Sequence, residues 1–312
     1  MKVLLSGVSS FTGYWFAKDL VDRGHDVTGV LTRQLSDYEG NRAARLQKLS
    51  NGCRLVEGVK FGDDRFLKLL NEKKFDIYCH HAAYMESYRS TGYDFVCAIQ
   101  NDGGMLNVIR RLKECGAKGI VYTGSVFEPG EGIGSDQVRA FSPYGVTKAA
   151  LFSYFKYFCH REQLKIGKFV IPNPFGAFEE PKFTTYLIKN WHSHTTPTVK
   201  TPDYVRDNIH VDLLARIYSK FCERLNTYEC EEVKINPSQY IETQGQFAVR
   251  FATEMSKRLG RDCPLKFGKQ VEFTEPMIRV NCDPALRLAP EWIEAEAWDS
   301  LARFYVEHAG PY

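Results

Sequence analysis

Tyr144 and Lys148 are the side chains of this sequence best suited to proton transfer, because they stand four residues apart in Tyr144-Gly-Val-Thr-Lys148. On a helix this spacing places both on one face, so that the ammonium lies near the phenol. The positive charge stabilises the phenolate and lowers the tyrosine pKa from its ordinary value of about 10. The pair is therefore predicted to act as a general acid–base, with Thr123 placed to hydrogen-bond the same substrate oxygen.

The same spacing also arises by chance, and a tyrosine on such a helix usually belongs to an amphipathic surface. Its position in the chain decides between the two interpretations. Thr123 ends the apolar run of residues 119–123, and residues 143–161, which carry the pair, have the pattern of a helix that follows. This placement favours the catalytic interpretation.

A strand–turn–helix pattern opens the chain. Residues 2–5 form a short apolar run, and apolar residues recur at helical spacing over residues 11–20. Between them lies Gly7-x-x-Ser10-x-x-Gly13. The first glycine permits a tight turn, the last permits close packing, and the helix N-terminus presents free N–H groups to a pyrophosphate. The pattern predicts a dinucleotide-binding turn, although both glycines would also suit a turn without a ligand.

Strand and helix patterns alternate up to about residue 171. Strands are expected at residues 2–5, 26–31, 54–56, 76–80, 119–123 and 168–171. Helices are expected at residues 11–20, 41–49, 65–73, 94–115 and 143–161. This alternation predicts an α/β fold, a Rossmann doubly wound parallel sheet with right-handed crossovers.

After residue 172 the pattern becomes irregular and rich in proline and aromatic residues. Helices are expected at residues 210–222 and 244–259, with short strands at 233–235 and 266–267. We therefore expect an NAD(P)-binding Rossmann domain over residues 1–171 and a smaller C-terminal substrate-binding lobe over residues 172–312. Some segments of the second half are expected to return to the first domain.

The composition excludes several classes of function. The 312 residues include 41 Lys and Arg against 38 Asp and Glu, and a formal net charge of +3 predicts neither nucleic-acid nor membrane binding. Apolar runs are strand-length and no signal-peptide pattern opens the chain, which favours a cytoplasmic protein. Nine cysteines without a Cys-x-x-Cys pair indicate free thiols and no metal site.

These motifs, with several segments further along, resemble one family. The chain is similar to the extended short-chain dehydrogenase/reductases of the nucleotide-sugar epimerase/dehydratase/reductase group. The resemblance is carried by Gly7-x-x-Ser-x-x-Gly13, His81-Ala-Ala83, Thr123 three residues before Val126-Phe127, Tyr144-x-x-x-Lys148, Pro172-Asn-Pro-Phe-Gly176, Arg206-Asp-Asn-Ile-His-Val211 and Asn281-Cys-Asp-Pro-Ala-Leu-Arg-Leu288. The order of these motifs is specific for the superfamily and says little about the substrate.

The resemblance implies a role for each matching position of the first domain. Tyr144 is the expected acid–base catalyst, Lys148 lowers its pKa and hydrogen-bonds the nicotinamide ribose, and Thr123 orients the sugar oxygen. The residues expected to bind the cofactor are Gly7, Ser10, Phe11 and Gly13 at the pyrophosphate turn, Asp63 at the adenine and Ala82 along the cofactor. His80, His81 and His210 are interpreted as scaffold positions rather than metal ligands.

In the second half, the resemblance implies a site for a nucleoside-diphosphate sugar. Asn173 is expected where the substrate begins. Arg206 and Arg279 are candidate partners of the nucleoside diphosphate, and a surface ion pair is the alternative for each.

Three departures from the family pattern bear on the reaction. The second strand ends at Thr32-Arg33-Gln34, where NAD-binding relatives usually place a carboxylate. An arginine suits a 2′-phosphate, so NADP is favoured over NAD, although Arg33 also fits an ordinary surface. Gly124-Ser125 stand where the dehydratases carry an Asp-Glu acid–base pair, and neither residue can move the protons of an elimination. Glu128 replaces a common glycine, which leaves the geometry of its loop open.

These departures favour a reductase, because a reductase consumes NADPH in every turnover whereas an epimerase usually retains NAD. We expect an NADPH-dependent reductase of a nucleoside-diphosphate keto-sugar, by analogy a 4-keto-6-deoxyhexose, in polysaccharide biosynthesis. A nucleotide-sugar 4-epimerase with tightly bound NAD is the alternative, and a non-catalytic NADP-binding regulator is a more distant one. A homodimer is a further expectation, because relatives often pair through two helices and residues 151–158 are rich in aromatics.

Overall fold

The computed structural model describes residues 1–88, 90, 92–135, 138–140 and 142–308. The chain divides into two compact units. The first comprises residues 1–131, 139–171 and 215–236, and the second comprises residues 132–138, 172–214 and 237–312. Each unit has a sheet of its own, so each buries a separate core.

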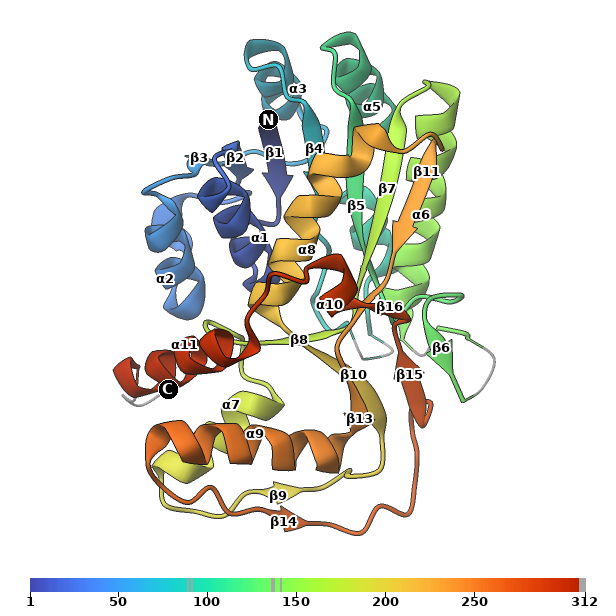
Figure 1. Ribbon diagram of the computed structural model, residues 1–312. Coiled ribbons are helices and arrows are strands. Elements are labelled where there is room, and N and C mark those ends of the chain that lie inside the picture. Colours follow the sequence, from blue (N-terminus) through green and yellow to red (C-terminus); the bar gives the residue numbers. More distant parts are fainter. Residues whose placement is uncertain (89, 91, 136–137, 141, 309–312) are drawn as a thin grey trace. The chain divides into compact units, whose positions relative to one another are not determined.

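A seven-stranded parallel sheet forms the centre of the first unit (Figure 1). Its order is β11-β7-β5-β4-β1-β2-β3, with every adjacent pair parallel. The strands are β1 Lys2–Ser6, β2 Asp26–Val30, β3 Arg54–Val56, β4 Ile77–His80, β5 Gly119–Ser125, β7 Lys165–Ile171 and β11 Glu232–Ile235. Strand order reverses at β1, and sheets of this kind bind ligands beside the reversal, at the carboxyl ends of the strands. The predicted Rossmann-type α/β fold is confirmed.

Helices cover both faces of this sheet, which explains why its strands are almost wholly apolar. They are α1 Phe11–Asp22, α2 Gly40–Leu49, α3 Asp64–Glu72, α4 Phe95–Gln100, α5 Met105–Glu114, α6 Pro143–Arg161 and α8 Val211–Arg224, with the 3-10 turns η1 Leu35–Asp37 and η2 Leu225–Thr227. On one face, α3, α5 and α6 share a hydrophobic cluster with Tyr78, Ile120 and Tyr122. On the other face, the Phe16 ring of α1 stacks on Tyr218 of α8, with centroids 3.9 Å apart.

The helix predicted over residues 94–115 is in fact two helices, α4 and α5. Gly104 has a φ of +75°, and a Cβ on Gly62 would lie 2.2 Å from the Gly103 carbonyl oxygen. This close approach of two glycine backbones interrupts the helix and brings Asp102 Oδ1 to 3.2 Å from His80 Nε2. The prediction was wrong because apolar periodicity continues on both sides of the break.

The seventh strand comes from the second half of the chain. Residues 233–235 are predicted as a short strand of the second half, from which some segments are expected to return to the first domain. β11 is such a segment, because it pairs in parallel with β7, with Val233 opposite Gly167. The chain reaches this edge through α8, which packs tightly on the sheet, since a Cβ on Gly167 would lie 2.8 Å from the Phe221 ring. Periodicity identifies the strand but cannot assign its partner.

A five-stranded sheet forms the second unit, with the order β13-β10-β15-β6 and β8 paired with β10. Its strands are β6 Ile133–Gly134, β8 Asn173–Phe175, β10 Val205–His210, β13 Tyr240–Thr243 and β15 Ile278–Val280. The short pairs β9 Thr198–Val199 with β14 Lys266–Phe267 and β12 Pro237–Ser238 with β16 Asp283–Pro284, and the helices α7 Phe183–His192, α9 Gln244–Leu259, α10 Ala285–Leu288 and α11 Glu294–Glu307, complete the unit. Phe175, Phe251 and Trp298 pack together in its core, and Phe175 and Trp298 have centroids 5.4 Å apart.

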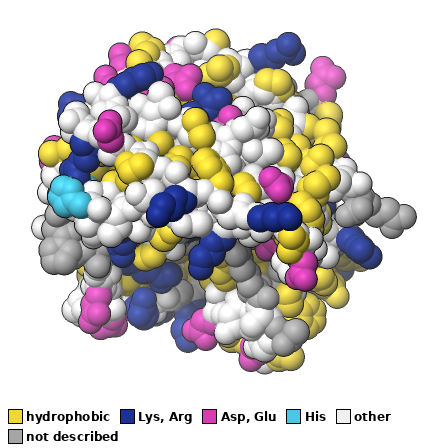
Figure 2. Space-filling view, turned by 90° about the horizontal axis from the view of Figure 1, so that it is seen from below, with side chains coloured by type: hydrophobic (Ala, Val, Ile, Leu, Met, Phe, Trp, Pro, Cys, Tyr) yellow, Lys and Arg dark blue, Asp and Glu magenta, His cyan; other side chains and the backbone are white. Residues whose placement is uncertain are grey.

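The surface carries charges of both signs. On the face drawn in Figure 2, Lys and Arg side chains are interspersed with Asp and Glu, and hydrophobic side chains lie between them. The near balance of charge in the composition thus extends to this face. In the part of the chain that the structure describes, no helix is long and apolar enough to cross a membrane.

Candidate active site

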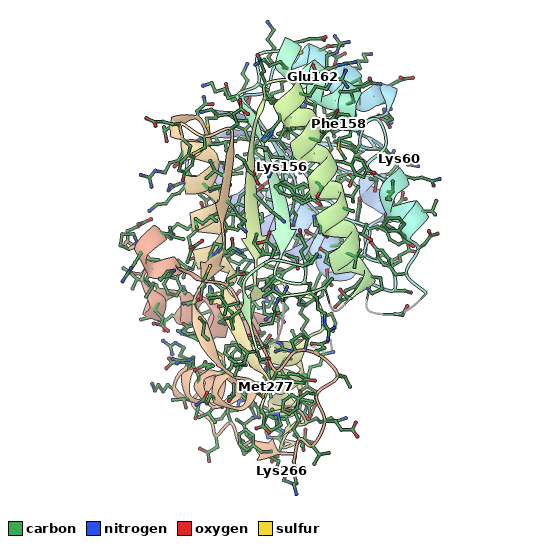
Figure 3. The ribbon with its side chains drawn as sticks, turned by 90° about the vertical axis from the view of Figure 1, so that its right-hand side faces the viewer. Lys60, Lys156, Phe158, Glu162, Lys266 and Met277 are labelled. Atoms are coloured by element: carbon green, nitrogen blue, oxygen red, sulfur yellow. The ribbon has the colours of Figure 1, made fainter. Side chains whose placement is uncertain are left out.

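Helix α6 carries Tyr144 and Lys148 and begins and ends where the sequence predicts. The hydroxyl of Ser142 caps its first turn. Along the helix (Figure 3), Lys156 Nζ lies 2.5 Å from Glu232 Oε2 of β11. Glu162 also forms an ion pair, with Arg110 of α5, and Phe158 packs against the core. The C-terminal half of the helix is thus held to β11 and α5.

The glycine-containing residues 7–13 form a tight turn between β1 and α1. Gly7 has a φ of +72°, and a Cβ on Gly13 would lie 2.2 Å from the Gly7 carbonyl oxygen, so both positions require glycine. Ser10 Oγ accepts the Gly13 N–H at 3.1 Å and donates to the Gly7 carbonyl at 2.8 Å, and Phe11 is buried. The turn fits a dinucleotide, because it places the N-terminus of α1 beside the reversal of strand order.

The segment after β4 packs directly on this turn. A Cβ on Gly7 would lie 2.8 Å from the Ala82 nitrogen, so the Ala82 backbone touches the turn. His81 Nε2 lies 3.1 Å from Ser10 Oγ and 2.9 Å from Thr12 Oγ1. Burial lowers the pKa of His81 to about 3, so its imidazole is neutral. Sequence reasoning identified His81 only as a scaffold position and missed its contact with these two hydroxyls.

The two residues expected near the adenosine end of a cofactor have different surroundings. Arg33 follows β2, is exposed, and holds its guanidinium 4.5 Å from the centre of the Tyr38 ring. Asp63 caps α3, because Oδ1 accepts the Phe66 N–H at 2.7 Å and Oδ2 accepts the Lys60 N–H at 3.0 Å. Both carboxylate oxygens of Asp63 therefore already accept hydrogen bonds from backbone N–H groups. Its contact with adenine stays a prediction.

Thr123, Tyr144 and Lys148 lie on β5 and α6, which the structure ties together. The Tyr122 hydroxyl donates to the Lys148 carbonyl at 3.0 Å, and Lys148 Nζ lies 4.2 Å from the centre of the Tyr122 ring. Thr123 and Lys148 are both buried. Tyr144 is partly buried, and its ring meets that of Tyr88 edge to face at 6.0 Å.

The electrostatics of this pair differ from the expectation. Burial raises the pKa of the Tyr144 phenol, and the charge of Glu128 and two neighbouring tyrosines raise it further. Burial also lowers the pKa of Lys148 to about 8, against the opposing effect of Glu128. The predicted lowering of the Tyr144 pKa is therefore not seen, because removal from water dominates and the Lys148 ammonium lies over the Tyr122 ring. Tyr144 is protonated at neutral pH and can donate a proton.

The three residues expected to bind substrate all lie in the second unit. The buried Nδ2 of Asn173 has no hydrogen-bond partner among the described residues, which suits a ligand. Arg206 and Arg279 are register partners on β10 and β15. Arg206 donates to the carbonyls of residues 276–277 and pairs with Glu275 at 3.1 Å. The ion-pair alternative therefore describes Arg206 in this structure.

Glu128, whose loop the sequence left open, is fully buried and lies 2.6 Å from Lys168 Nζ of β7. The signal for such a pair was a lysine inside an apolar strand, since a buried charge requires a partner. Beside it, Ser125 Oγ accepts the Phe127 N–H at 3.2 Å. Gly124 and Ser125 thus offer no acid or base at the end of β5.

The first unit therefore combines three elements of one chemistry: a turn for a pyrophosphate, a protonated phenol and a buried ammonium. This arrangement can bind a dinucleotide and transfer one proton to an oxygen. In the ranges that the structure describes, no group of three or more His, Cys, Asp or Glu could hold a metal ion.

Two sequence comparisons bear on this site. Residues 3–235 match the sequence model of the NAD dependent epimerase/dehydratase family, and the match ends at the last residue of β11. UDP-glucose 4-epimerase 3 of Oryza sativa subsp. japonica is 25% identical over 162 residues, which are 49% of this chain and 43% of that protein. The similarity thus spans less than half the length of that curated relative.

Solved structures share the fold over nearly the whole chain. A mutant UDP-glucuronic acid 4-epimerase of Bacillus cereus, in complex with UDP-4-deoxy-4-fluoro-glucuronic acid and NAD, has a TM-score of 0.75 at 18% identity over 99% of this chain and 100% of that chain. UDP-glucose 4-epimerase of Thermotoga maritima with UDP-glucose has a TM-score of 0.74 at 16% identity over the same shares, 99% and 100%. At these identities the similarity establishes the fold alone.

Proposed function

Because the chain belongs to the NAD dependent epimerase/dehydratase family, as its motifs predict, we propose that it is an NADPH-dependent reductase of a keto-sugar linked to a nucleoside diphosphate. The observation that carries the proposal is the placement of Tyr144 on α6, four residues before the buried Lys148, where burial and Glu128 raise the Tyr144 pKa and favour the protonated phenol. Reduction of a carbonyl needs a proton donor, whereas oxidation of an alcohol needs a base. A protonated phenol in the dinucleotide-binding unit supplies that donor.

The proposed cofactor is NADPH. The Gly7–Gly13 turn and the Ala82 backbone would hold its pyrophosphate, and Lys148 would hydrogen-bond its ribose. Arg33 supports a 2′-phosphate, because its exposed guanidinium forms no ion pair within the described ranges and its charge is available to a phosphate. When bound, the cofactor supplies a hydride to the substrate carbonyl.

Three side chains perform the remaining chemistry of this proposal. Tyr144 donates its phenolic proton to the carbonyl oxygen as that oxygen becomes an alcohol, and Thr123 hydrogen-bonds and orients the same oxygen. The Lys148 ammonium stabilises the phenolate until solvent returns the proton. Because Thr123 and Lys148 are buried, little water screens these interactions.

Elimination of water suits the site poorly. It requires one group to remove a C5 proton and another to protonate the leaving hydroxyl. Ser125 is far too weak an acid, and a side chain at position 124 would displace the paired Lys168 and Glu128, because a Cβ on Gly124 would lie 2.7 Å from Lys168 Cε and 3.0 Å from Glu128 Oε1. Glu128 is itself held by Lys168. These contacts support a reductase over a dehydratase.

The substrate class is proposed from the relatives and from the second unit. The similar proteins are named for, or solved with, UDP-sugars. Arg206 and Arg279, on paired strands, would neutralise a diphosphate once Arg206 exchanges its bond to Glu275. The unpartnered amide of Asn173 would hydrogen-bond the substrate. By analogy we propose a 4-keto-6-deoxyhexose on a nucleoside diphosphate.

The test is a panel of nucleoside-diphosphate 4-keto-6-deoxyhexoses with different bases, assayed for loss of NADPH absorbance and for product by mass spectrometry. We expect one NADPH consumed for each alcohol formed, and no keto-sugar formed from an intact nucleotide hexose. Tyr144→Phe is the control, because it keeps the ring and loses the proton. A wild-type protein that leaves NADPH unchanged with every substrate of the panel would overturn the proposal.

A 4-epimerase with tightly held NAD is the second candidate, because the named relatives are 4-epimerases. It predicts that NAD remains with the purified protein, detectable in its ultraviolet absorbance. It also predicts interconversion of UDP-glucose and UDP-galactose without added cofactor and without net oxidation. That result would replace the reductase assignment.

A homodimer through α6 is also part of the proposal. Tyr154 and Tyr157 are 56% and 59% exposed on this helix, whereas Phe152 and Phe155 of the same helix are buried. Pairing of two copies through α6 would remove these two exposed aromatics from water.

A further inference from the structure

A buried cluster of charges lies beneath the carboxyl end of β5. Lys168 Nζ donates to Glu128 Oε2 at 2.6 Å and to Glu131 Oε1 at 2.7 Å. The side chains of Lys168 and Glu128 are 4% and 0% exposed. Burying charges costs free energy unless they are paired and hydrogen-bonded, so the cluster is held together tightly. In the proposed mechanism Glu128 enters only through its effect on the Tyr144 pKa, and Lys168 and Glu131 have no role.

The second oxygen of Glu128 closes the turn at the end of β5. Glu128 Oε1 accepts the Ser125 N–H at 2.7 Å, while the Glu128 N–H donates to the Ser125 carbonyl at 3.0 Å. Gly124 makes room for the cluster, since its Cβ would collide with Lys168 and Glu128. The two departures from the family pattern, a glycine at position 124 and a glutamate at position 128, are therefore one structural feature.

The start of α6 rests on this turn. A Cβ on Gly145 would lie 2.1 Å from the Phe127 carbonyl oxygen, so the backbone of Phe127 touches the helix beside Tyr144. A shift of the residue 125–128 turn would therefore move Tyr144 directly. The Glu128 side chain, bonded at one oxygen to Ser125 and at the other to Lys168, prevents such a shift.

We propose that Glu128 is a positioning residue of the reaction, which fixes the turn beneath Tyr144 and places a carboxylate, paired with Lys168, near the Tyr144–Lys148 pair. This inference rests on the proposed roles of Tyr144 and Lys148. The site of this chain thus uses a buried carboxylate that touches neither cofactor nor substrate.

The charge of Glu128 acts on both members of the pair, since it raises the pKa of Tyr144 and that of Lys148. The other titratable groups that act on the pair differ between Lys148 and Tyr144. Around Lys148 they are Asp102, which raises its pKa, and Lys168, which lowers it; around Tyr144 they are Tyr93 and Tyr88, which raise its pKa. Glu128 contributes to both groups, so its removal changes the pair as a unit.

The test compares Glu128→Gln with Glu131→Gln. Both variants remove one carboxylate from the same Lys168 ammonium and keep the shape of the side chain. Glu128 also bonds Ser125, whereas Glu131 also accepts hydrogen bonds from Lys234 and Asn236. In Glu128→Gln we expect the alkaline limb of the pH–rate profile for NADPH oxidation to move down by about one pH unit. We also expect kcat to fall roughly 10-fold with KM nearly unchanged, the scale of a disturbed proton donor. The Glu131→Gln profile should follow that of the wild type.

A second readout does not depend on turnover. NMR of protein labelled with ¹³C at lysine Cε, with the Lys148 signal assigned by its loss in Lys148→Arg, measures the Lys148 pKa. We expect this pKa to be below the wild-type value in Glu128→Gln and equal to it in Glu131→Gln. If the wild type turns over no substrate, this titration still tests the inference after the proposed function has failed. Equal titrations of Lys148 in the wild type and Glu128→Gln, or equal shifts in both variants, would overturn it.

A third variant separates the hydrogen bonds that Glu128 makes to Ser125 and Lys168 from the charge of its carboxylate. It also keeps the inference testable if Glu128→Gln folds poorly. Glu128→Asp keeps the charge but is too short to bond Ser125 and Lys168 together. We expect it to keep the wild-type pH profile and to lose kcat. A Glu128→Asp protein with a wild-type kcat would show that fixing the residue 125–128 turn does not contribute to the reaction.

Discussion

The phenol of Tyr144 faces two opposing demands. Burial and Glu128 raise its pKa, which favours the protonated donor. The transfer itself leaves a phenolate that burial destabilises. In the proposed mechanism the Lys148 ammonium, which lies over the Tyr122 ring, would offset this cost once the phenolate forms, because opposite charges attract more strongly in a buried site than in water. Such a donor is suited to start from the protonated state and to reduce a carbonyl.

We predict that Tyr144→Phe binds NADPH as the wild type does and loses turnover by roughly 100-fold or more, the usual effect of removing an acid–base catalyst. Lys148→Met should lose as much turnover and should also bind NADPH more weakly, because it loses the contact with the ribose. Fluorescence titration and steady-state rates measure the two effects. Tyr154→Phe, on the exposed side of α6, is the matched control. Tyr144→Phe with wild-type activity would remove Tyr144 from the mechanism.

Arg33→Ala should weaken the binding of NADPH by about 1.5–3 kcal/mol, the scale of a charge-assisted hydrogen bond, and leave the binding of NADH nearly unchanged. The reason is that only NADPH carries the phosphate that this guanidinium would pair with. Titration of both cofactors against both proteins checks the difference. Arg54→Ala, an exposed arginine at the start of β3, should change neither affinity. An equal loss for both cofactors would make Arg33 a structural residue.

Local rules made part of this site predictable from the sequence. Gly7 and Gly13 follow from backbone geometry, and the bounds of α6 place Tyr144 and Lys148 on one helix. The Glu128–Lys168 pair does not follow, because 40 residues separate its members and only the folded sheet brings them together. The direction of the Tyr144 pKa is equally hidden, since it depends on how distant segments exclude water.

Among the elements, helix ends were predicted best where the sequence contains residues that cap helices. α9 begins with Thr243 and Gln246 in a capping box and ends at Gly260 with a φ of 62°, and its predicted bounds are confirmed. The prediction of one helix over residues 94–115 was wrong because the break depends on a contact between Gly62 and Gly103, which are far apart in the sequence. Strand β11 was identified and a return of later segments to the first domain was expected, but the sequence did not show which segment returns, because pairing is a property of the whole sheet.

The junction between β8 and α7 depends on one buried carboxyl group. Glu179 Oε2 accepts the Gly176 N–H at 3.1 Å, and Oε1 accepts the Thr184 hydroxyl at 2.9 Å. Burial raises the pKa of Glu179 from 4.5 to about 7, against the opposing charge of Lys182. The folded protein therefore keeps a proton here that the unfolded chain releases. The stability from this group is complete below pH 4.5 and is lost as pH rises through about 7.

We predict that Glu179→Gln removes this dependence, because the amide stays neutral at every pH. Between about pH 5 and pH 8.5, the free energy of unfolding of the wild type should fall relative to that of the variant by up to about 3 kcal/mol. Urea unfolding at both pH values measures the difference, and Glu180→Gln is the matched control. Parallel pH dependences of wild type and Glu179→Gln would show that folding does not raise the pKa of Glu179.

At the scale of the whole molecule, the proposed homodimer is tested by adding charge to α6. Tyr154→Glu combined with Tyr157→Glu should convert a dimer to a monomer in light scattering, because both side chains are exposed on the helix and charge opposes their burial. NADPH binding should persist, since neither residue belongs to the cofactor turn. Val249→Glu, an exposed apolar position of α9, is the control. A monomeric wild type would contradict the prediction.

The return of α8 and β11 to the first sheet also governs how the chain can be synthesised. Residues 215–236 leave the ribosome after residues 172–214, which belong to the other unit. A nascent chain that ends at residue 171 therefore has β7 as an open edge and lacks the Tyr218 ring that contacts Phe16 and Phe169. Open edges and bare apolar surface attract other chains. We expect the growing protein to need chaperones until β11 has emerged.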